Sequence, residues 1–273
     1  MRATALERRS VGATTRQYGA QQRSSVAVGN VGFVAASQTR AARGFKTFLG
    51  RYFYLCTALL MALLAAWAFS HTIEAGLLHA QPPRPLLLWV HAACFLAWIV
   101  LFLAQSALVR TRKVRLHRTL GWFGAALATT MVVSGFIVSV VMLRFEVTVL
   151  HRNVASFLAI LWGDMIIFGA CMALAIYFRK RPEYHRRLVF LASCQLMQAV
   201  FVRFHYLGVH DLYFPALDLL IVAGVARDLV VDGRVNRVYV YVFPGMIALQ
   251  VLATYLKLVN PSWWQAVTTA ILG

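Results

Sequence analysis

The stretch LLLWVHAACFLAWIVLFLAQSALV, residues 86–109, contains no Asp, Glu, Lys or Arg. It is longer than the roughly 20 apolar residues that an α-helix needs to cross the hydrocarbon of a bilayer, and such a run is typical of a transmembrane helix. The composition extends this interpretation to the whole chain, because 60% of its 273 residues are hydrophobic and 13% are charged, against about 25% charged in soluble domains. We therefore expect an integral membrane protein.

Apolar runs of similar length lie on both sides of this stretch. The expected spans are about 51–70, 86–109, 118–143, 154–178, 188–206, 214–231 and 238–258. The last stretch, NPSWWQAVTTAILG, is too short to cross a membrane, and its Trp263 and Trp264 suit the membrane–water interface. The sequence thus predicts an all-α, polytopic seven-helix transmembrane bundle over residues 47–273.

The distribution of basic residues predicts the orientation of this bundle. The chain has 27 Lys and Arg against 9 Asp and Glu, an excess that in a soluble protein would indicate nucleic acid. Here the basic residues gather in the N-terminal tail and in alternate loops at 110–118, 179–187 and 234–237, as the positive-inside rule predicts for cytoplasmic segments. We expect a cytoplasmic N-terminus, a C-terminus outside, the lipid bilayer as partner and no nucleic acid. Lys257, at the outer end of its span, argues against a retinal Schiff base.

Two further compositional features bear on domain organisation. Residues 1–46 are rich in Arg, Ser, Thr, Ala and Gln, with Glu7 as the only acidic residue, which predicts a disordered basic cytoplasmic tail. The cysteines lie within apolar runs without CxxC spacing, a pattern typical of small buried residues rather than a disulfide framework. They are Cys56, Cys94, Cys171 and Cys194.

Four segments carry a resemblance to known proteins: LLLWVHA, LHRTLGWFGAALA, AIYFRKRPEYHRRL and LDLLIVAGVARDL. Over about residues 50–265 the chain resembles a family of uncharacterised bacterial multi-pass inner-membrane proteins with paired LHRxLG and HRRL cytoplasmic turns. The resemblance implies a location in the bacterial inner (cytoplasmic) membrane. Because the family has no established activity, no functional residue is carried over from it.

Asp164 stands near the middle of the fourth expected span, where insertion scales put the cost of an aspartate at about 2.5–3.5 kcal/mol. Gln198 is at the same depth in the fifth span, and Gln195 shares its helical face. Other polar residues near this depth are Thr129, Thr130 and Gln250. Two interpretations stay open: a protonated Asp164 hydrogen-bonds Gln198 and only fixes helix packing, or Asp164 is a protonatable site with an aqueous route outward.

A second polar layer lies nearer the outside and contains six of the eight histidines. They are His71, His79, His91, His151, His205 and His210. Imidazole is the commonest metal and haem ligand, so His91, His205, His151 and His71 are candidate ligands of a metal ion or of a single b-type haem. His91 and His205 are the candidate axial pair. The alternative is that each histidine is a hydrogen-bonded residue at a helix interface.

Charged residues near the two membrane surfaces have simpler interpretations. Arg203 and Asp218 lie at similar depth in neighbouring spans, which predicts an ion pair between helices. Two cytoplasmic turns each carry a His-Arg pair, which we interpret as a lipid-phosphate anchor. These residues are His117, Arg118, His185 and Arg186.

The sequence contains no P-loop, G-x-G-x-x-G, H-E-x-x-H or G-x-S-x-G motif. Our first hypothesis is a redox protein that binds one b-type haem or a metal ion through a membrane-embedded His/Asp site. The alternatives are a proton-coupled transporter of a small solute centred on Asp164, and a non-catalytic membrane scaffold or assembly factor. Enzymatic activity, a protein partner and a homo-oligomer all stay open at this stage.

Overall fold

The structure, a computed structural model, describes residues 43–273. The expected tail, 1–46, therefore lies outside the described residues except for 43–46, which belong to the first helix, Arg43–Ser70. The chain divides after Gly50 into two compact units, and the second of these, Arg51–Gly273, contains the helical bundle.

The described residues are helical, and no strand occurs among them. After the first helix come η1 (Glu74–Leu78), α2 (Leu86–Arg110), α3 (Val114–Thr148), η2 (Ala155–Phe157), α4 (Leu158–Tyr177), α5 (Pro182–Leu196), α6 (Gln198–Phe201), α7 (His205–Val209), α8 (Tyr213–Asp232), α9 (Arg237–Val259) and α10 (Ser262–Leu272).

Five of the described helices are long and apolar enough to cross a membrane, so the expectation of a membrane protein with several transmembrane helices is confirmed. They are Arg43–Ser70, Leu86–Arg110, Val114–Thr148, Ala155–Tyr177 and Arg237–Val259. The count of seven is not confirmed. The expected span 188–206 is broken into α5, α6 and α7, and the expected span 214–231 forms α8, which carries Asp218, Arg227 and Asp228.

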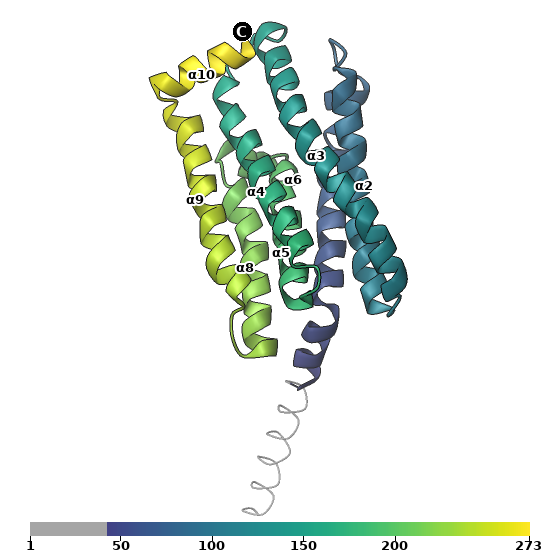
Figure 1. Cartoon of the computed structure of the whole chain (residues 1–273). Coiled ribbons are helices and arrows are strands. Elements are labelled where there is room, and N and C mark those ends of the chain that lie inside the picture. The colour runs from purple at the N-terminus through teal and green to yellow at the C-terminus, as the bar shows by residue number, and fades with distance from the viewer. Residues whose placement is uncertain (1–42) are drawn as a thin grey trace, which may run out of the picture. The chain divides into compact units, whose positions relative to one another are not determined.

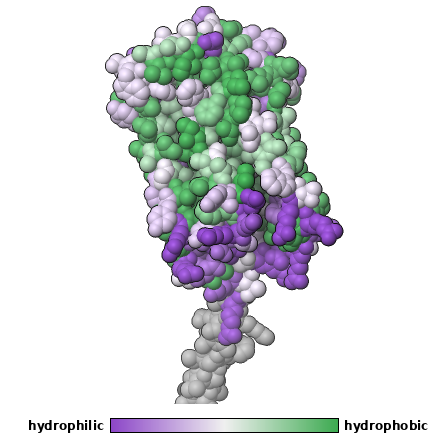
Figure 2. All heavy atoms as spheres, viewed as in Figure 1, coloured by the Kyte–Doolittle hydropathy of each residue, from purple (hydrophilic) through white to green (hydrophobic). Residues whose placement is uncertain are grey.

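The surface of the bundle has the polarity that a bilayer requires. Large apolar side chains such as Leu63, Leu86 and Trp122 are exposed, and Figure 2 shows hydrophobic residues over most of the visible surface, with hydrophilic residues gathered at one end. Figure 1 places the α2–α3, α4–α5 and α8–α9 turns at that end. The three basic loops therefore share one end of the bundle, as the positive-inside rule predicts.

Helix α4 is the centre of the bundle, because it packs against α3, α5 and α9. Glycines allow the closest approaches between helices. A Cβ atom on Gly135 of α3 would lie 2.2 Å from Met165 Sδ of α4. A Cβ atom on Gly224 of α8 would lie 2.5 Å from Tyr239 Oη of α9 and 2.7 Å from Phe190 Cε1 of α5. The contact at Gly224 thus brings α5, α8 and α9 together.

The substitution Gly224→Ala should destabilise the bundle by about 1–3 kcal/mol, because the added methyl group overpacks the contact among these three helices. The measurement is the free energy of unfolding in mild detergent titrated with sodium dodecyl sulfate. Gly245→Ala in α9 is the matched control, since a Cβ atom there meets nothing within 4 Å. Equal stability of the two variants would contradict the packing described here.

Candidate functional site

A chain of four polar side chains crosses the interior of the bundle. Gln195 Nε2 of α5 donates to Asp164 Oδ1 of α4 at 2.7 Å. Gln250 Nε2 of α9 donates to Gln195 Oε1 at 3.3 Å and to Asp218 Oδ1 of α8 at 3.2 Å. Two carboxyl groups are thus joined through two carboxamides. Asp164, Gln195 and Gln250 are buried and Asp218 is half-buried. We call these four side chains the polar chain, and it lies where α4, α5, α8 and α9 meet.

The helix that supplies Gln195 is interrupted two residues further along the chain, at Met197. Helix α5 ends at Leu196, Met197 has a turn conformation, and α6 runs only from Gln198 to Phe201. The backbone N–H of Met197 donates to the carbonyl oxygen of Cys194, three residues back, rather than to the carbonyl four residues back as in an α-helix. This is the tighter hydrogen bonding of a 3₁₀ turn. Phe204 is then extended, with ψ of 114°, ahead of α7. The polar chain therefore lies beside a break in a helix.

Three residues expected near Asp164 do not contact it. Gln198, which we expected as its partner, is buried, and its Nε2 has no hydrogen-bond partner. The donor to Asp164 is Gln195 instead. Thr129 and Thr130 are exposed, and each hydroxyl donates to a carbonyl of its own helix, at Ala125 and Ala126. The threonines therefore do not join the polar chain.

The outer histidines are dispersed over separate elements. His91 of α2 makes one long contact of 3.5 Å, from Nδ1 to Ser134 Oγ of α3. His71 Nδ1 lies 2.8 Å from the carbonyl oxygen of Trp67, and both His151 and His205 are exposed. No hydrogen bond or ring contact joins His91 to His205. Within residues 43–273, no three or more His, Cys, Asp or Glu side chains are grouped so that they could hold a metal ion.

Arg203 and Asp218 do not pair with each other in the described residues. Arg203 Nη1 donates to the carbonyl of Ala199, and its guanidinium lies 4.1 Å from the centre of the Phe69 ring. Asp218 accepts from Gln250. The expected ion pair is therefore absent: Arg203 bonds to the backbone four residues earlier, and Asp218 bonds to Gln250 of α9.

The two His-Arg turns approach each other. The rings of His117 and His185 have centroids 6.5 Å apart, and His185 Nδ1 lies 2.9 Å from the carbonyl oxygen of Ala175. Arg118 is exposed, whereas the guanidinium of Arg186 lies 5.7 Å from the centre of the Tyr54 ring. The proposed lipid-anchoring role of these residues stays a prediction.

A second polar cluster, which we did not predict, joins α5 to α8 at the end that carries the basic loops. Arg187 donates to both oxygens of Asp228 at 2.7 Å and to Asp232 Oδ2 at 2.8 Å. Arg227 donates to the same two carboxylates at 2.9 and 2.7 Å. The backbone N–H of Asn236 donates to Asp228 at 3.3 Å, so the start of α9 is attached to the same group. We call these two arginines and two aspartates the ion cluster.

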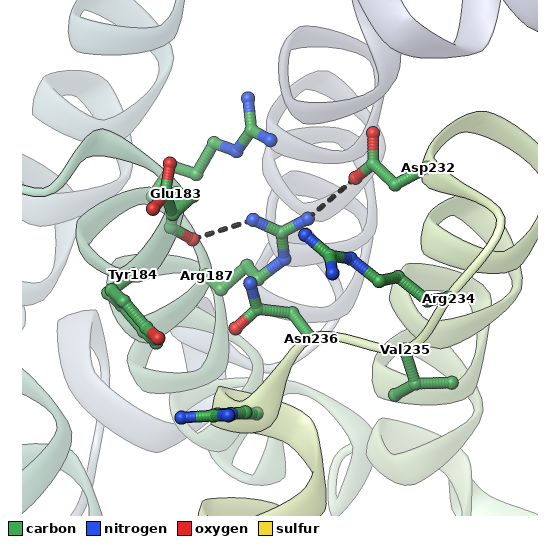
Figure 3. Close-up of a pocket in the computed structure, with 9 residues that line it drawn as sticks. Glu183, Tyr184, Arg187, Asp232, Arg234, Val235 and Asn236 are labelled. Atoms are coloured by element: carbon green, nitrogen blue, oxygen red, sulfur yellow. Dashed lines mark hydrogen bonds and ion pairs between the residues drawn. The ribbon is translucent and has the colours of Figure 1, made fainter.

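Two members of the ion cluster, Arg187 and Asp232, line a pocket with a volume of about 610 Å³. The lining includes four arginines and two acidic residues, which are Arg186, Arg187, Arg234, Arg237, Glu183 and Asp232. Figure 3 shows Arg187 between Asp232 and the backbone of Glu183. Arg234 and Asn236 lie on the short connection between α8 and α9. The pocket is therefore a polar cavity with an excess of positive charge.

The sequence did contain a signal for the ion cluster. The segment ARDLVVDG places two aspartates, Asp228 and Asp232, one helical turn apart in a chain with only 9 acidic residues. Acidic residues that interrupt a strongly basic end indicate partners for particular arginines. Which arginines they are depends on the packing of α5 against α8.

The substitution Asp228→Asn should destabilise the protein by about 3–5 kcal/mol, because it leaves two buried guanidinium groups short of a counter-charge. The side chain of Asp232 is 35% exposed. Asp232→Asn should therefore lower the free energy of unfolding by about 1 kcal/mol or less, because water screens that site. The same detergent titration measures both. If Asp232→Asn proved the more damaging change, the assignment of Asp228 as the centre of the cluster would be wrong.

Comparison with known proteins adds no homologue to this picture. No family model matches the chain, and searches of curated proteins and of solved structures found no match.

Proposed function

We propose that this protein is a proton-coupled transporter of a small solute in the bacterial inner membrane, with Asp164 as the group that takes up and releases the proton. The observation that carries the proposal is the hydrogen-bonded chain from Asp164 through Gln195 and Gln250 to Asp218. An ionisable residue within a transmembrane bundle is costly, and such residues mark ion and proton pathways.

The surroundings of Asp164 suit a change of protonation. A protonated carboxyl is neutral and needs few partners, whereas a carboxylate in hydrocarbon needs several hydrogen-bond donors. Gln195 supplies one donor. Gln198 lies one turn further along the chain with a buried Nε2 that has no partner, so its amide is free to donate after a local movement. Loss of the proton would thus favour a rearrangement of this segment.

The break between α5 and α6 provides a segment that can rearrange. Discontinuous helices form the substrate and ion sites of many secondary transporters, near the middle of the membrane. Here the break falls between Gln195 and Gln198, directly beside the polar chain. We infer that the proton on Asp164 and the conformation of residues 196–204 are coupled, and that this coupling drives solute movement.

The other two hypotheses receive less support. The redox hypothesis needs histidines that converge, and His91, His205, His151 and His71 come from different segments without contacts among them. It stays a prediction that a spectrum and a metal assay of the purified protein would test. The scaffold hypothesis treats the polar chain as packing alone. It differs from our proposal in one measurable respect, because it requires no proton exchange at Asp164.

We further infer that α5–α6 and α8 also cross the membrane, which would make seven crossings with a cytoplasmic N-terminus and the C-terminus outside. Lys257, in the last turn of α9, pairs with Asp211 of the α7–α8 turn. Its ammonium also lies 5.5 Å from the ring centre of Phe157, next to the start of α4. The α7–α8 turn is therefore close to the end of α9 and the start of α4, at the opposite end from the basic loops.

Asp164→Asn should abolish proton exchange while it preserves the fold, because the asparagine oxygen still accepts from Gln195. In the wild type, infrared difference spectra across the pH range of the folded protein should contain a protonated-carboxyl band that is missing in Asp164→Asn. In proteoliposomes with an internal pH dye, a panel of amino acids, sugars and carboxylates should yield at least one solute that drives proton flux. Asp164→Asn should reduce this flux to the level of protein-free vesicles.

Glu74→Gln is the matched control for this experiment. The substitution removes one carboxyl group outside the polar chain, from a side chain that is 78% exposed. It should keep both the band and the flux. A wild-type spectrum without a titrating band, or flux that survives in Asp164→Asn, would reject the proposed role of Asp164. A folded protein with no titrating band would favour the scaffold.

The seven-crossing topology predicts that His210→Cys, in a variant without native cysteines, reacts with a membrane-impermeant thiol reagent from the outside of intact cells. His210 is exposed in the α7–α8 turn. In a five-crossing protein the same position would face the cytoplasm and react only after the cells are permeabilised. Lys180→Cys in the α4–α5 turn is the control for the cytoplasmic side in both topologies.

A further inference from the structure

We propose that the pocket between α5 and the start of α9 binds a phosphate-bearing anion, either the headgroup of an anionic phospholipid or a soluble phosphate monoester. The volume of about 610 Å³ is in the range of pockets that hold small ligands. Arginine is the side chain best suited to phosphate, because its planar guanidinium donates two parallel hydrogen bonds to the oxygens. This inference does not depend on the proton chemistry of Asp164.

Three of the four lining arginines have no acidic partner among residues 43–273. Arg234 and Arg237 are exposed and make no ion pair within that range. Arg186 contacts the Tyr54 ring, and its Nε is buried without a hydrogen-bond partner. The guanidinium groups of Arg234 and Arg237 are thus available to a ligand, and Arg186 adds positive charge to the pocket. Glu183 is the one acidic lining residue whose carboxylate is outside the ion cluster, so the pocket keeps a positive excess.

The fourth arginine holds the pocket in shape. Arg187 is 2% exposed, and its guanidinium donates to Asp228, to Asp232 and to the carbonyl oxygen of Glu183 at 2.6 Å. Its donors are therefore occupied within the protein, and we assign it a positioning role. The ion cluster sets the distance between α5 and α8 and anchors Asn236, next to Arg237. A preformed wall of this kind reduces the ordering cost of binding.

The location of the pocket indicates the chemistry of its ligand. Its lining residues belong to the start of α5 and to the segment from the end of α8 to the start of α9, at the end of the bundle where hydrophilic residues gather (Figure 2). Basic pockets between transmembrane helices on the cytoplasmic side bind anionic lipid headgroups. A soluble phosphate monoester also presents non-bridging phosphate oxygens, without acyl chains and with up to two negative charges where a diester headgroup carries one. Both sources satisfy the arginines in the same way, and a binding experiment separates them.

The test uses the full chain in micelles of dodecyl maltoside, an uncharged detergent without phosphate, with thermal unfolding followed by tryptophan fluorescence. One arm titrates phosphatidylglycerol and the other titrates glycerol 3-phosphate, because a ligand that binds only the folded state raises the unfolding temperature. The test variant is Arg234→Gln/Arg237→Gln, which leaves the ion cluster intact. The control is Lys113→Gln/Arg115→Gln in the α2–α3 turn, which removes the same charge from exposed positions at the same end.

We expect at least one of the two probes to raise the unfolding temperature of the wild type. The dissociation constant of that probe should be at least about tenfold higher for the test variant, because two charged donors are lost. The control should bind as the wild type does. An effect of phosphatidylglycerol alone identifies a lipid ligand, and an effect of glycerol 3-phosphate identifies a soluble one. The proposal is overturned if neither probe stabilises the wild type, or if both variants weaken binding equally.

Discussion

A polar group that enters hydrocarbon must find its hydrogen-bond partner inside the protein, because no water is there to replace it. The two polar clusters of this protein follow that constraint. Asp164 is satisfied by Gln195, which is satisfied by Gln250. At the end with the basic loops, two buried arginines are balanced by Asp228 and Asp232. The helices that supply these partners can pack in few other ways, so the arrangement of α4, α5, α8 and α9 depends on polar contacts as much as on apolar ones.

Helices α5 and α8 contribute to both clusters. Arg187 and Gln195 are about 12 Å apart along α5 at 1.5 Å per residue, and Asp218 and Asp228 are about 15 Å apart along α8. The two helices are joined directly by the ion cluster and indirectly through Gln250. Beyond Gln195 the regular helix ends. One end of this helix pair is therefore firmly held, and the other leads into the interrupted segment on which the proposed transport function depends.

The partners of the polar residues were harder to predict than their depth. Asp164 lies near the midpoint of Ala155–Tyr177, as counting residues along an apolar run predicted, and Gln250 joins it in one layer. The prediction that Gln198 is the partner of Asp164 was wrong. Gln195 and Gln198 share a helical face, and the rotation and interruption of the helix decide which of the two amides reaches α4. The expected pair of Arg203 with Asp218 rested on depth alone. Depth follows from chain length, whereas contact also requires the azimuth of each helix, which is set by packing.

The all-helical class, the several apolar spans and the alternation of the basic loops could be predicted from the sequence, because hydrophobic length and charge are properties of contiguous residues. The sequence also placed a carboxyl at the middle of a span. Three features follow only from the three-dimensional packing: the run 188–206 is broken after Leu196, Asp164 and Asp218 are connected through two glutamines, and two arginines of α5 line one pocket with one arginine of the α8–α9 connection and one at the start of α9. These features depend on side chains distant in sequence, whose meeting is decided by how neighbouring helices rotate and pack against one another.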